Sequence, residues 1–338
     1  MTLVERLDRF QRKHPQAGLP IAVIYKFAED QGTYLAALIT YYGFLSLFPL
    51  LLLMATILNF VLAGNPGMQQ DVLNSALGQF PVVGAQLSDP RGVSGSGIGL
   101  AVGIIGTLYG GLGVALAVQN AMNTVWRVPR NSRPNPIKSR VLSLLLLAVT
   151  GLAFGLTTVL SGLSAAAGSY GVSVGGGIKV LLIVLSFAVN AAVFTAGFRL
   201  ATATSITIRQ TLPGAVTAAA AWQLLQFSGT AFVGGVVKNS TAVNSVFALV
   251  LGLIAWIYLE AFVVGLAAEY NAVRSLRLYP RALLTPFTDN VQLTAADHVA
   301  YTDQARAQRA KGFQDITVTF TPTDPEPPEE PAHPSAEE

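Results

Sequence analysis

The chain has no cysteine and few charged residues for its length. The absence of cysteine excludes disulfide bridges, thiolate metal sites and a cysteine nucleophile. Charged residues make up 12% of the 338 residues, whereas soluble domains carry about 25%. With 52% hydrophobic residues and a mean hydropathy of +0.52, the chain has too few polar groups to cover a surface in water. The composition therefore predicts an integral membrane protein.

Histidine is also scarce, and its three copies, His14, His298 and His333, lie outside the long apolar segments. Hydrolytic chemistry usually needs paired carboxylates, a histidine base or a metal ion. The sequence contains no cluster with metal-ligand spacing, no phosphate-binding glycine loop and no nucleophile elbow. We therefore expect no enzyme activity, no catalytic residues, and no bound metal ion or cofactor.

Six apolar segments are each long enough to cross the ~30 Å hydrocarbon core of a bilayer, which takes about 20 helical residues. They lie near 36–62, 97–119, 141–164, 179–200, 211–236 and 245–268. Peptide groups in hydrocarbon must be hydrogen-bonded within the protein, and a helix does this inside one segment. The sequence thus predicts an all-α fold, a bundle of six transmembrane helices within residues 35–275.

The regions on either side of this bundle are predicted to be different in kind. Residues 1–34 contain Leu3, Leu7 and Phe10 at helical spacing opposite charged residues, which predicts short amphipathic helices at the membrane interface. Residues 276–338 are predicted to form a polar tail, disordered from about residue 321, where the sequence becomes acidic and rich in proline.

Basic residues are distributed unevenly around the predicted spans. Of the 21 Lys and Arg residues, all but Arg91, Lys179 and Lys238 fall on one side of the predicted membrane. Loops rich in lysine and arginine stay in the cytoplasm. Both termini are therefore predicted to be cytoplasmic.

Glycines follow one face of the second span. They recur at spacings of four, three, four and three, at Gly99, Gly103, Gly106, Gly110 and Gly113. Helices in lipid associate largely through close packing, and small residues let two backbones approach. We expect the stripe to be a packing surface for a neighbouring helix; a mobile helix is the alternative reading.

Pro49 lies inside the first span. Proline cannot donate a backbone hydrogen bond to the carbonyl one turn earlier, here that of Leu45, so it predicts a kink. The kink is either a hinge or a fixed bend.

Glu260 is the clearest ionisable residue within a span, seven residues inward from Ala267, or ~10 Å along a helix. A free carboxylate is costly at that depth, so Glu260 should be protonated, paired or exposed to water. Arg199, near the cytoplasmic end of the fourth span, is the candidate partner. The alternatives are a structural Glu260–Arg199 pair and a carboxylate coupled to protons or substrate.

Other polar residues extend this candidate intramembrane site. Glu269 lies about half a turn out of phase with Glu260, so we expect it to serve the interface on another face. Gln223 and Gln226 share a face of the fifth span beside Trp222. Such amides either line a polar cavity or hydrogen-bond between helices.

Four segments resemble the YihY/BrkB family of bacterial inner-membrane proteins, over about residues 20–275. They are FLSLFPLLLLM at 44–54, MNTVWRVPRNSRP at 122–134, LPGAVTAAAAWQLL at 212–225 and VFALVLGLIAWIYLEAFVVGLAAEYNAV at 246–273. The resemblance assigns family positions to Pro49, Asn123, Trp126, Pro213, Gly214, Trp222, Tyr258, Glu269 and Asn271. The chain departs from the family at Asn244-Ser245, where relatives commonly have Tyr-Gly.

The resemblance implies a six-helix protein of the bacterial inner membrane. The family also carries an older label, ribonuclease BN, and relatives have been linked with virulence and the cell envelope. The basic loop at 126–140 could attract RNA, but five positive charges beside a membrane are expected from topology alone. Without a catalytic set, we expect neither ribonuclease activity nor a nucleic-acid partner.

Two functions fit these observations. The first is a transporter or flippase-like protein for an amphipathic or lipid-related solute, favoured by the kinked span and the intramembrane carboxylate. The alternative is a non-transporting scaffold that recruits envelope partners, which the glycine stripe and polar tail fit equally well. The lipid bilayer is a partner in both, and a homo-oligomer is compatible with either.

Overall fold

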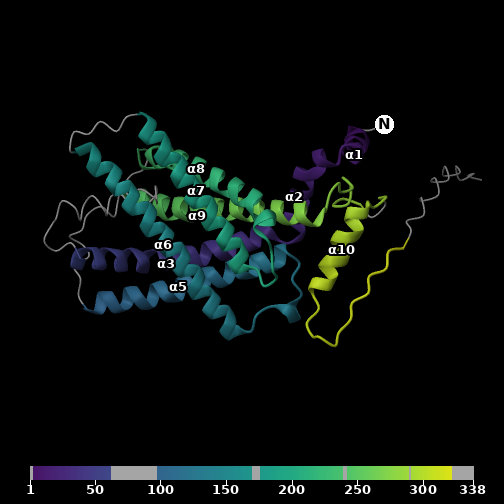
Figure 1. Cartoon of the computed structure of the whole chain (residues 1–338), viewed down its shortest axis with the longest axis horizontal. Coiled ribbons are helices and arrows are strands. Elements are labelled where there is room, and N and C mark those ends of the chain that lie inside the picture. Colours follow the sequence, from purple (N-terminus) through teal and green to yellow (C-terminus); the bar gives the residue numbers. More distant parts are fainter. Residues whose placement is uncertain (1–2, 62–96, 170–175, 239–241, 289–290, 322–338) are drawn as a thin grey trace, which may run out of the picture.

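The computed structural model describes residues 3–61, 97–169, 176–238, 242–288 and 291–321. Throughout these ranges the chain forms helices joined by short connections, without a strand, which confirms the predicted all-α fold. Six long helices of 26 to 35 residues make up the bundle in Figure 1. They are α3 (Gly32–Val61), α5 (Gly97–Val125), α6 (Pro136–Ser169), α7 (Gly176–Ala201), α8 (Ile208–Lys238) and α9 (Ala242–Leu276).

Three of the long helices contain stretches that are long and apolar enough to cross a membrane. In the described part of the chain these are Gly103–Val125, Ile183–Ala201 and Val250–Leu276. Large apolar side chains also cover the outside of the bundle, with 66% to 76% of their surface exposed: Ile105, Leu152, Leu224 and Phe247. An exterior of this kind is solvated by lipid rather than by water. The count of six crossings stays a prediction.

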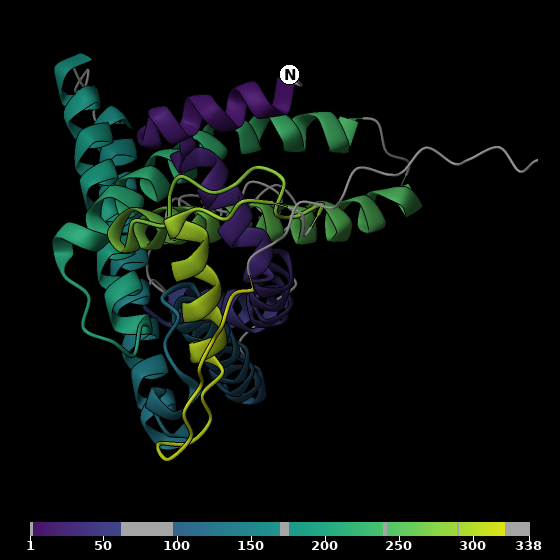
Figure 2. The same ribbon diagram turned by 90° about the vertical axis from the view of Figure 1, so that its right-hand side faces the viewer.

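Three shorter helices lie together at one end of the bundle. They are α1 (Leu3–Lys13), α2 (Leu19–Glu29) and α10 (Ala295–Ala307), and a 3-10 turn, η1 (Pro15–Gly18), joins the first two. Figure 2 looks onto this end, where α1 and α10 lie in front of the long helices. Segments from both ends of the sequence therefore meet at the same end of the molecule.

The glycine stripe of α5 lies against α3, and the two helices run antiparallel. A Cβ added at Gly106 would lie 2.7 Å from Pro49 Cβ, and one added at Gly110 would lie 2.5 Å from Ser46 Cβ. At Gly113 an added Cβ would collide with the Tyr42 ring. Gly103 is also buried in the bundle, whereas the surroundings of Gly99 lie outside the described side chains. Because these glycines have no side chain, α3 packs directly against the backbone of α5.

Pro49 belongs to this same contact. The helix α3 continues through Pro49, whose ring lies beside Gly106. Proline in a helix interior leaves a carbonyl without its hydrogen bond. Gly106 has no side chain, so α5 leaves room for the Pro49 ring. The predicted kink stays a prediction.

The polar region after α9 contains structure that the sequence analysis did not predict. Helix α10 begins with a capping box, in which the Thr294 side chain accepts from Asp297 N and the Asp297 side chain accepts from Thr294 N. Its Gln304 side chain donates to Glu29 O at the end of α2. Residues 322–338, where disorder was predicted, lie outside the described residues.

Candidate functional site

Lys26 is completely buried where α2 meets the ends of α5 and α9. Its ammonium group donates to Asp30 Oδ2 at 2.6 Å, to Glu269 Oε2 at 2.8 Å and to Val125 O at 2.7 Å. A lysine ammonium has three donors, and all three are used here. Lys26 therefore ties the N-terminal segment to two long helices.

Arg127 continues this charged contact from the end of α5. Its Nη2 atom lies 3.2 Å from Asp30 Oδ1 and 3.5 Å from Glu29 Oε2. The Arg127 backbone is left-handed, with φ of 52°, and Val128 N donates to Asn123 O. Glycine usually fills this position at a helix C-terminus because side chains disfavour positive φ. The arginine here places a charge where glycine would be easier to accommodate.

Arg281 forms the third cationic position, after the end of α9. Its Nη2 atom lies 2.5 Å from Glu29 Oε1, and its Nε atom lies 2.5 Å from Asp297 Oδ1. Burial alone would lower the pKa of Arg281, but the hydrogen bonds and charges of Glu29 and Asp297 outweigh it and raise the pKa. The guanidinium therefore stays charged and links α2 to α10.

Together these residues form what we call the buried ion cluster. Its members are Lys26, Glu29, Asp30, Arg127, Glu269, Arg281 and Asp297. Removing ions from water is expensive, so a cluster of this kind is stable only when its members are paired and hydrogen-bonded. The cluster joins the ends of α2, α5, α9 and α10 through these seven charged side chains.

Only Glu269 of this cluster was predicted as a site residue, and its partner was missed. The basic members were predicted only from their side of the membrane, because a count of positive charges does not say what each one contacts. One local signal was present: Lys26 interrupts an apolar helix four residues before Asp30, the spacing of a helical ion pair.

The structure does not join Glu260 with Arg199. Glu260 Oε1 instead accepts a hydrogen bond from Trp256 Nε1, one helical turn earlier, at 2.7 Å. Arg199 Nε donates to Ile206 O at 3.0 Å and closes the connection between α7 and α8. Glu260 and Arg199 are thus each hydrogen-bonded to a group close to them in the sequence, and not to one another.

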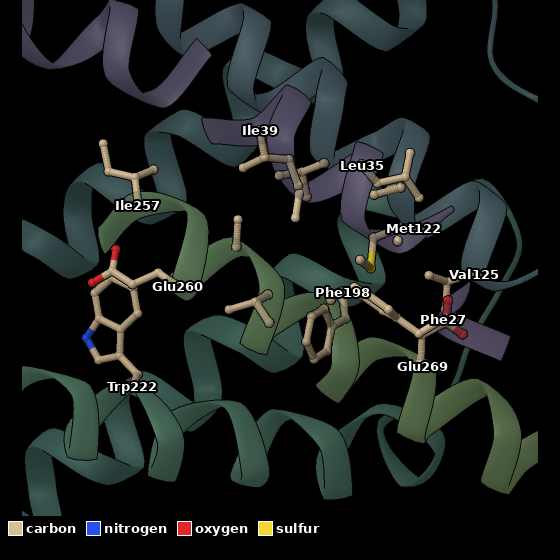
Figure 3. A pocket seen from close by; sticks show the side chains of 17 residues that line it. Phe27, Leu35, Ile39, Met122, Val125, Phe198, Trp222, Ile257, Glu260 and Glu269 are labelled. Carbon is tan, nitrogen blue, oxygen red and sulfur yellow. The ribbon is translucent and has the colours of Figure 1, made fainter. Parts of the chain in front are cut away.

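An apolar cavity of about 210 Å³ lies inside the bundle (Figure 3). Its walls come from α2, α3, α5, α7, α8 and α9, and the only ionisable side chains in its described lining are Glu260 and Glu269. In the view of Figure 3, Glu260 lies beside Trp222 and Ile257, while Glu269 lies near Phe27 and Val125 at the other side. Both carboxylates, which were expected on different faces, therefore lie in the wall of one cavity, at opposite sides of it.

The two glutamines of α8 are not part of this lining. Gln223 and Gln226 are half-buried, and the described wall of the cavity includes their neighbour Trp222 instead. The two roles predicted for these amides, hydrogen bonding between helices and lining a polar cavity, stay predictions.

Two asparagines at positions that carry the family resemblance form hydrogen bonds with backbone groups of other segments. Asn271 Oδ1 accepts from Gly214 N at 2.7 Å, and its amide donates to Thr211 O at 3.0 Å. Asn123 Oδ1 accepts from Ala203 N at 2.8 Å. A Cβ at Gly214 would collide with Asn271 and with the Ala267 carbonyl, so glycine lets α8 and α9 approach closely. These residues position the helices that enclose the apolar cavity.

The apolar exterior, the long helices and the cavity between them define an all-helical membrane protein. The family model described as Virulence factor BrkB matches residues 23–289, and the chain belongs to this family. This confirms the family that the sequence segments suggested.

Two relatives from other bacteria are similar to the chain. The UPF0761 membrane protein Mpe_A1422 of Methylibium petroleiphilum is 27% identical over 230 residues, covering 66% of this chain and 54% of the relative. A UPF0761 membrane protein of Azotobacter vinelandii is 25% identical over 257 residues, covering 72% of this chain and 60% of the relative. The chain thus spans little more than half the length of these curated relatives. No solved structure matches the chain.

Proposed function

We propose that the chain is a multi-pass transporter or flippase-like protein of the bacterial inner membrane, acting on an amphipathic or lipid-related solute. The observation that carries this proposal is the apolar cavity with Glu260 and Glu269 in its wall. The proposal includes no catalytic step and no cofactor.

The size and lining of the cavity favour part of an amphipathic molecule. Pockets that enclose a whole drug-sized ligand measure about 300–1,000 Å³, whereas this cavity measures about 210 Å³. An acyl-chain segment matches the apolar walls, and a polar group of the solute would meet Glu260. Ionisable residues within a membrane protein commonly mark substrate or proton pathways.

The arrangement of the termini supports the proposed orientation. Both α1 and α10 lie at one end of the bundle (Figure 1), and Asn131 in the arginine-containing loop that follows α5 donates to Arg309 O just beyond α10. An even number of crossings returns the chain to the side on which it started. Together with the excess of basic residues there, this favours a cytoplasmic location for both ends.

Transport can be tested with purified protein reconstituted into phospholipid vesicles. Fluorescently labelled phosphatidylglycerol and a labelled lysophospholipid serve as probes, and leaflet exchange is followed by quenching from outside. We expect protein-dependent exchange that Ala261→Phe, which fills the cavity, reduces at least about tenfold. The matched control is Leu259→Phe, because Leu259 is on the same helix but 41% exposed and outside the cavity lining.

Glu260→Gln separates the role of the charge from that of the volume. We expect it to reduce exchange while leaving the protein folded, since an amide oxygen can still accept from Trp256 Nε1. Exchange no faster than in protein-free vesicles, or equal exchange in the wild type and Ala261→Phe, would contradict the proposal. A scaffold without transport activity would then be favoured.

A further inference from the structure

A second cavity, of about 360 Å³, lies at the α10 end of the bundle and is polar. Residues from the turn between α2 and α3, the end of α5, the following loop and α10 form its wall. Three arginines from one short stretch, Arg127, Arg130 and Arg133, all line it. We call it the arginine pocket.

Arg127 lines this pocket, and two of its donor atoms are buried without a partner among the described residues. Its side chain is only 5% exposed, and its contacts with Asp30 and Glu29 are made through Nη2. Among the described residues, no acceptor lies within hydrogen-bond distance of its Nε or Nη1 atoms. Folded proteins rarely leave buried donors unpaired, because each one loses its hydrogen bonds to water. A ligand with acceptor oxygens would satisfy them.

Two carboxylates, Glu29 and Asp30, also line the pocket, and each is paired with a cation that is not part of the wall. Glu29 pairs with Arg281 at 2.5 Å, and Asp30 pairs with Lys26 at 2.6 Å. Adding Arg130 and Arg133 to the buried ion cluster gives five cations against four carboxylates. The surplus positive charge lies in the arginine pocket.

The other two arginines of the pocket have no acidic partner in the part of the chain that the structure describes. Arg133 donates to Asn120 Oδ1 at 3.0 Å and to Val128 O at 3.2 Å, both neutral acceptors. Arg130 is exposed, and within the described ranges it forms no ion pair. Burial lowers the pKa of Arg133, and the nearby positive charge of Arg130 lowers it further.

The pocket is held in place by the backbone around it. Asn131 N in the arginine loop donates to Arg309 O beyond α10 at 3.0 Å. At the end of α5, Arg127 N donates to Thr124 O at 2.9 Å and fixes the left-handed turn. A site whose shape exists before binding loses less conformational entropy when the ligand arrives.

We propose that the arginine pocket binds a phosphoryl group through Arg127, Arg130 and Arg133. A guanidinium donates two parallel hydrogen bonds to phosphate oxygens, and a phosphoryl group has enough oxygens to share among three arginines. The group belongs either to an anionic lipid head group or to a soluble phosphate compound. This site is separate from the apolar cavity and does not depend on the transport proposal, because binding alone is measured.

The test uses the purified full chain in a neutral detergent. Native mass spectrometry compares retention of phosphatidic acid with retention of zwitterionic phosphatidylcholine, and thermal unfolding is followed with and without inorganic pyrophosphate. The main variant is Arg130→Gln, because Arg130 has no described partner whose loss would affect folding. The matched control is Arg140→Gln, an exposed arginine of α6 outside the pocket.

We expect at least one of the two anions to bind, and Arg130→Gln to weaken its binding about tenfold, as expected for one charge-assisted contact. Retention of phosphatidic acid over phosphatidylcholine identifies a lipid head group, and stabilisation by pyrophosphate alone identifies a soluble compound. Binding of neither anion overturns the proposal. So does an equal loss of binding in Arg130→Gln and Arg140→Gln, which would indicate attraction to surface charge in general.

Arg127→Gln provides a second, independent check. Arg127 also contacts Asp30 and Glu29, so its unfolding temperature is measured alongside anion binding. We expect a larger loss of binding than in Arg130→Gln, in protein that remains folded at the assay temperature. Undiminished anion binding by folded Arg127→Gln would overturn the assignment of its unpaired donors to the ligand.

Discussion

The buried ion cluster and the contact between α3 and α5 hold helices together in opposite ways. The cluster places complementary charges from α2, α5, α9 and α10 in a region closed to water. The α3–α5 contact instead depends on side chains that are absent, at Gly106, Gly110 and Gly113. Removing one charged side chain should destabilise the cluster, because its partners are left charged and buried. Adding a side chain should destabilise the glycine contact.

The largest effect is expected from Lys26→Met, which leaves Asp30 and Glu269 buried without their shared cation. Breaking a buried pair by removing one partner costs about 3–5 kcal/mol. Thermal or denaturant unfolding in detergent measures the loss, with the exposed Lys13→Met as a control. The double variant Lys26→Met with Glu269→Gln should recover part of the stability. Failure to recover any would show that Glu269 is not the residue left unpaired.

A smaller and more local loss is expected from Asp297→Asn. This change removes the charge opposite Arg281 and weakens the cap of α10, but Arg281 keeps its contact with Glu29. Hydrogen bonds to charged groups contribute about 1.5–3 kcal/mol each. Hydrogen exchange should rise in α10 while the amides of α5 and α9 keep their protection. Uniform loss of protection would contradict a local role.

Gly110→Ala tests the glycine contact, because the added methyl group would meet Ser46 Cβ and its backbone. Overpacking of this kind costs about 1–3 kcal/mol. The matched control is Gly151→Ala, since an added Cβ there has no neighbour within 4 Å. The control should be neutral or stabilise the helix by up to about 1 kcal/mol. Equal unfolding temperatures for both variants would contradict close packing at Gly110.

The smallest change in stability is expected from Glu260→Gln. Its neighbour Glu269 on the same helix is bonded to Lys26, whereas Glu260 accepts from Trp256 within its own helix. The amide keeps an acceptor, so the free energy of unfolding should change by less than about 1 kcal/mol. Glu269→Gln should cost clearly more. Similar losses in the two variants would remove the distinction between the carboxylates.

The parts of the fold that depend on local pattern were predictable from the sequence. Uninterrupted apolar runs predicted the long helices, and the glycine spacing predicted a packing surface on α5. The partner helix α3 was not identified, because periodicity describes one surface and not what covers it. The capping box Thr294–Asp297 is a short-range signal that could have identified α10.

The candidate site was harder to predict because its contacts join distant residues. Lys26 and Glu269 are 243 residues apart, and Glu29 and Arg281 are 252 apart. Counting positive charges gives the side of the membrane but not the neighbours of each charge. The expected Glu260–Arg199 pair failed for a related reason: Trp256 and the Ile206 carbonyl were available locally.

The sequence distance between Lys26 and Glu269 also has a consequence during biosynthesis. Ribosomes add about 5–20 residues per second. Lys26 is therefore synthesised roughly 10–50 s before its partner Glu269, which lies 243 residues later in the chain. Before Glu269 is made, Asp30, the residue that follows α2, is the ion-pair partner of Lys26 already present in the chain. A nascent chain that stops before α9 therefore lacks one of the two carboxylates that pair with Lys26 in the complete structure.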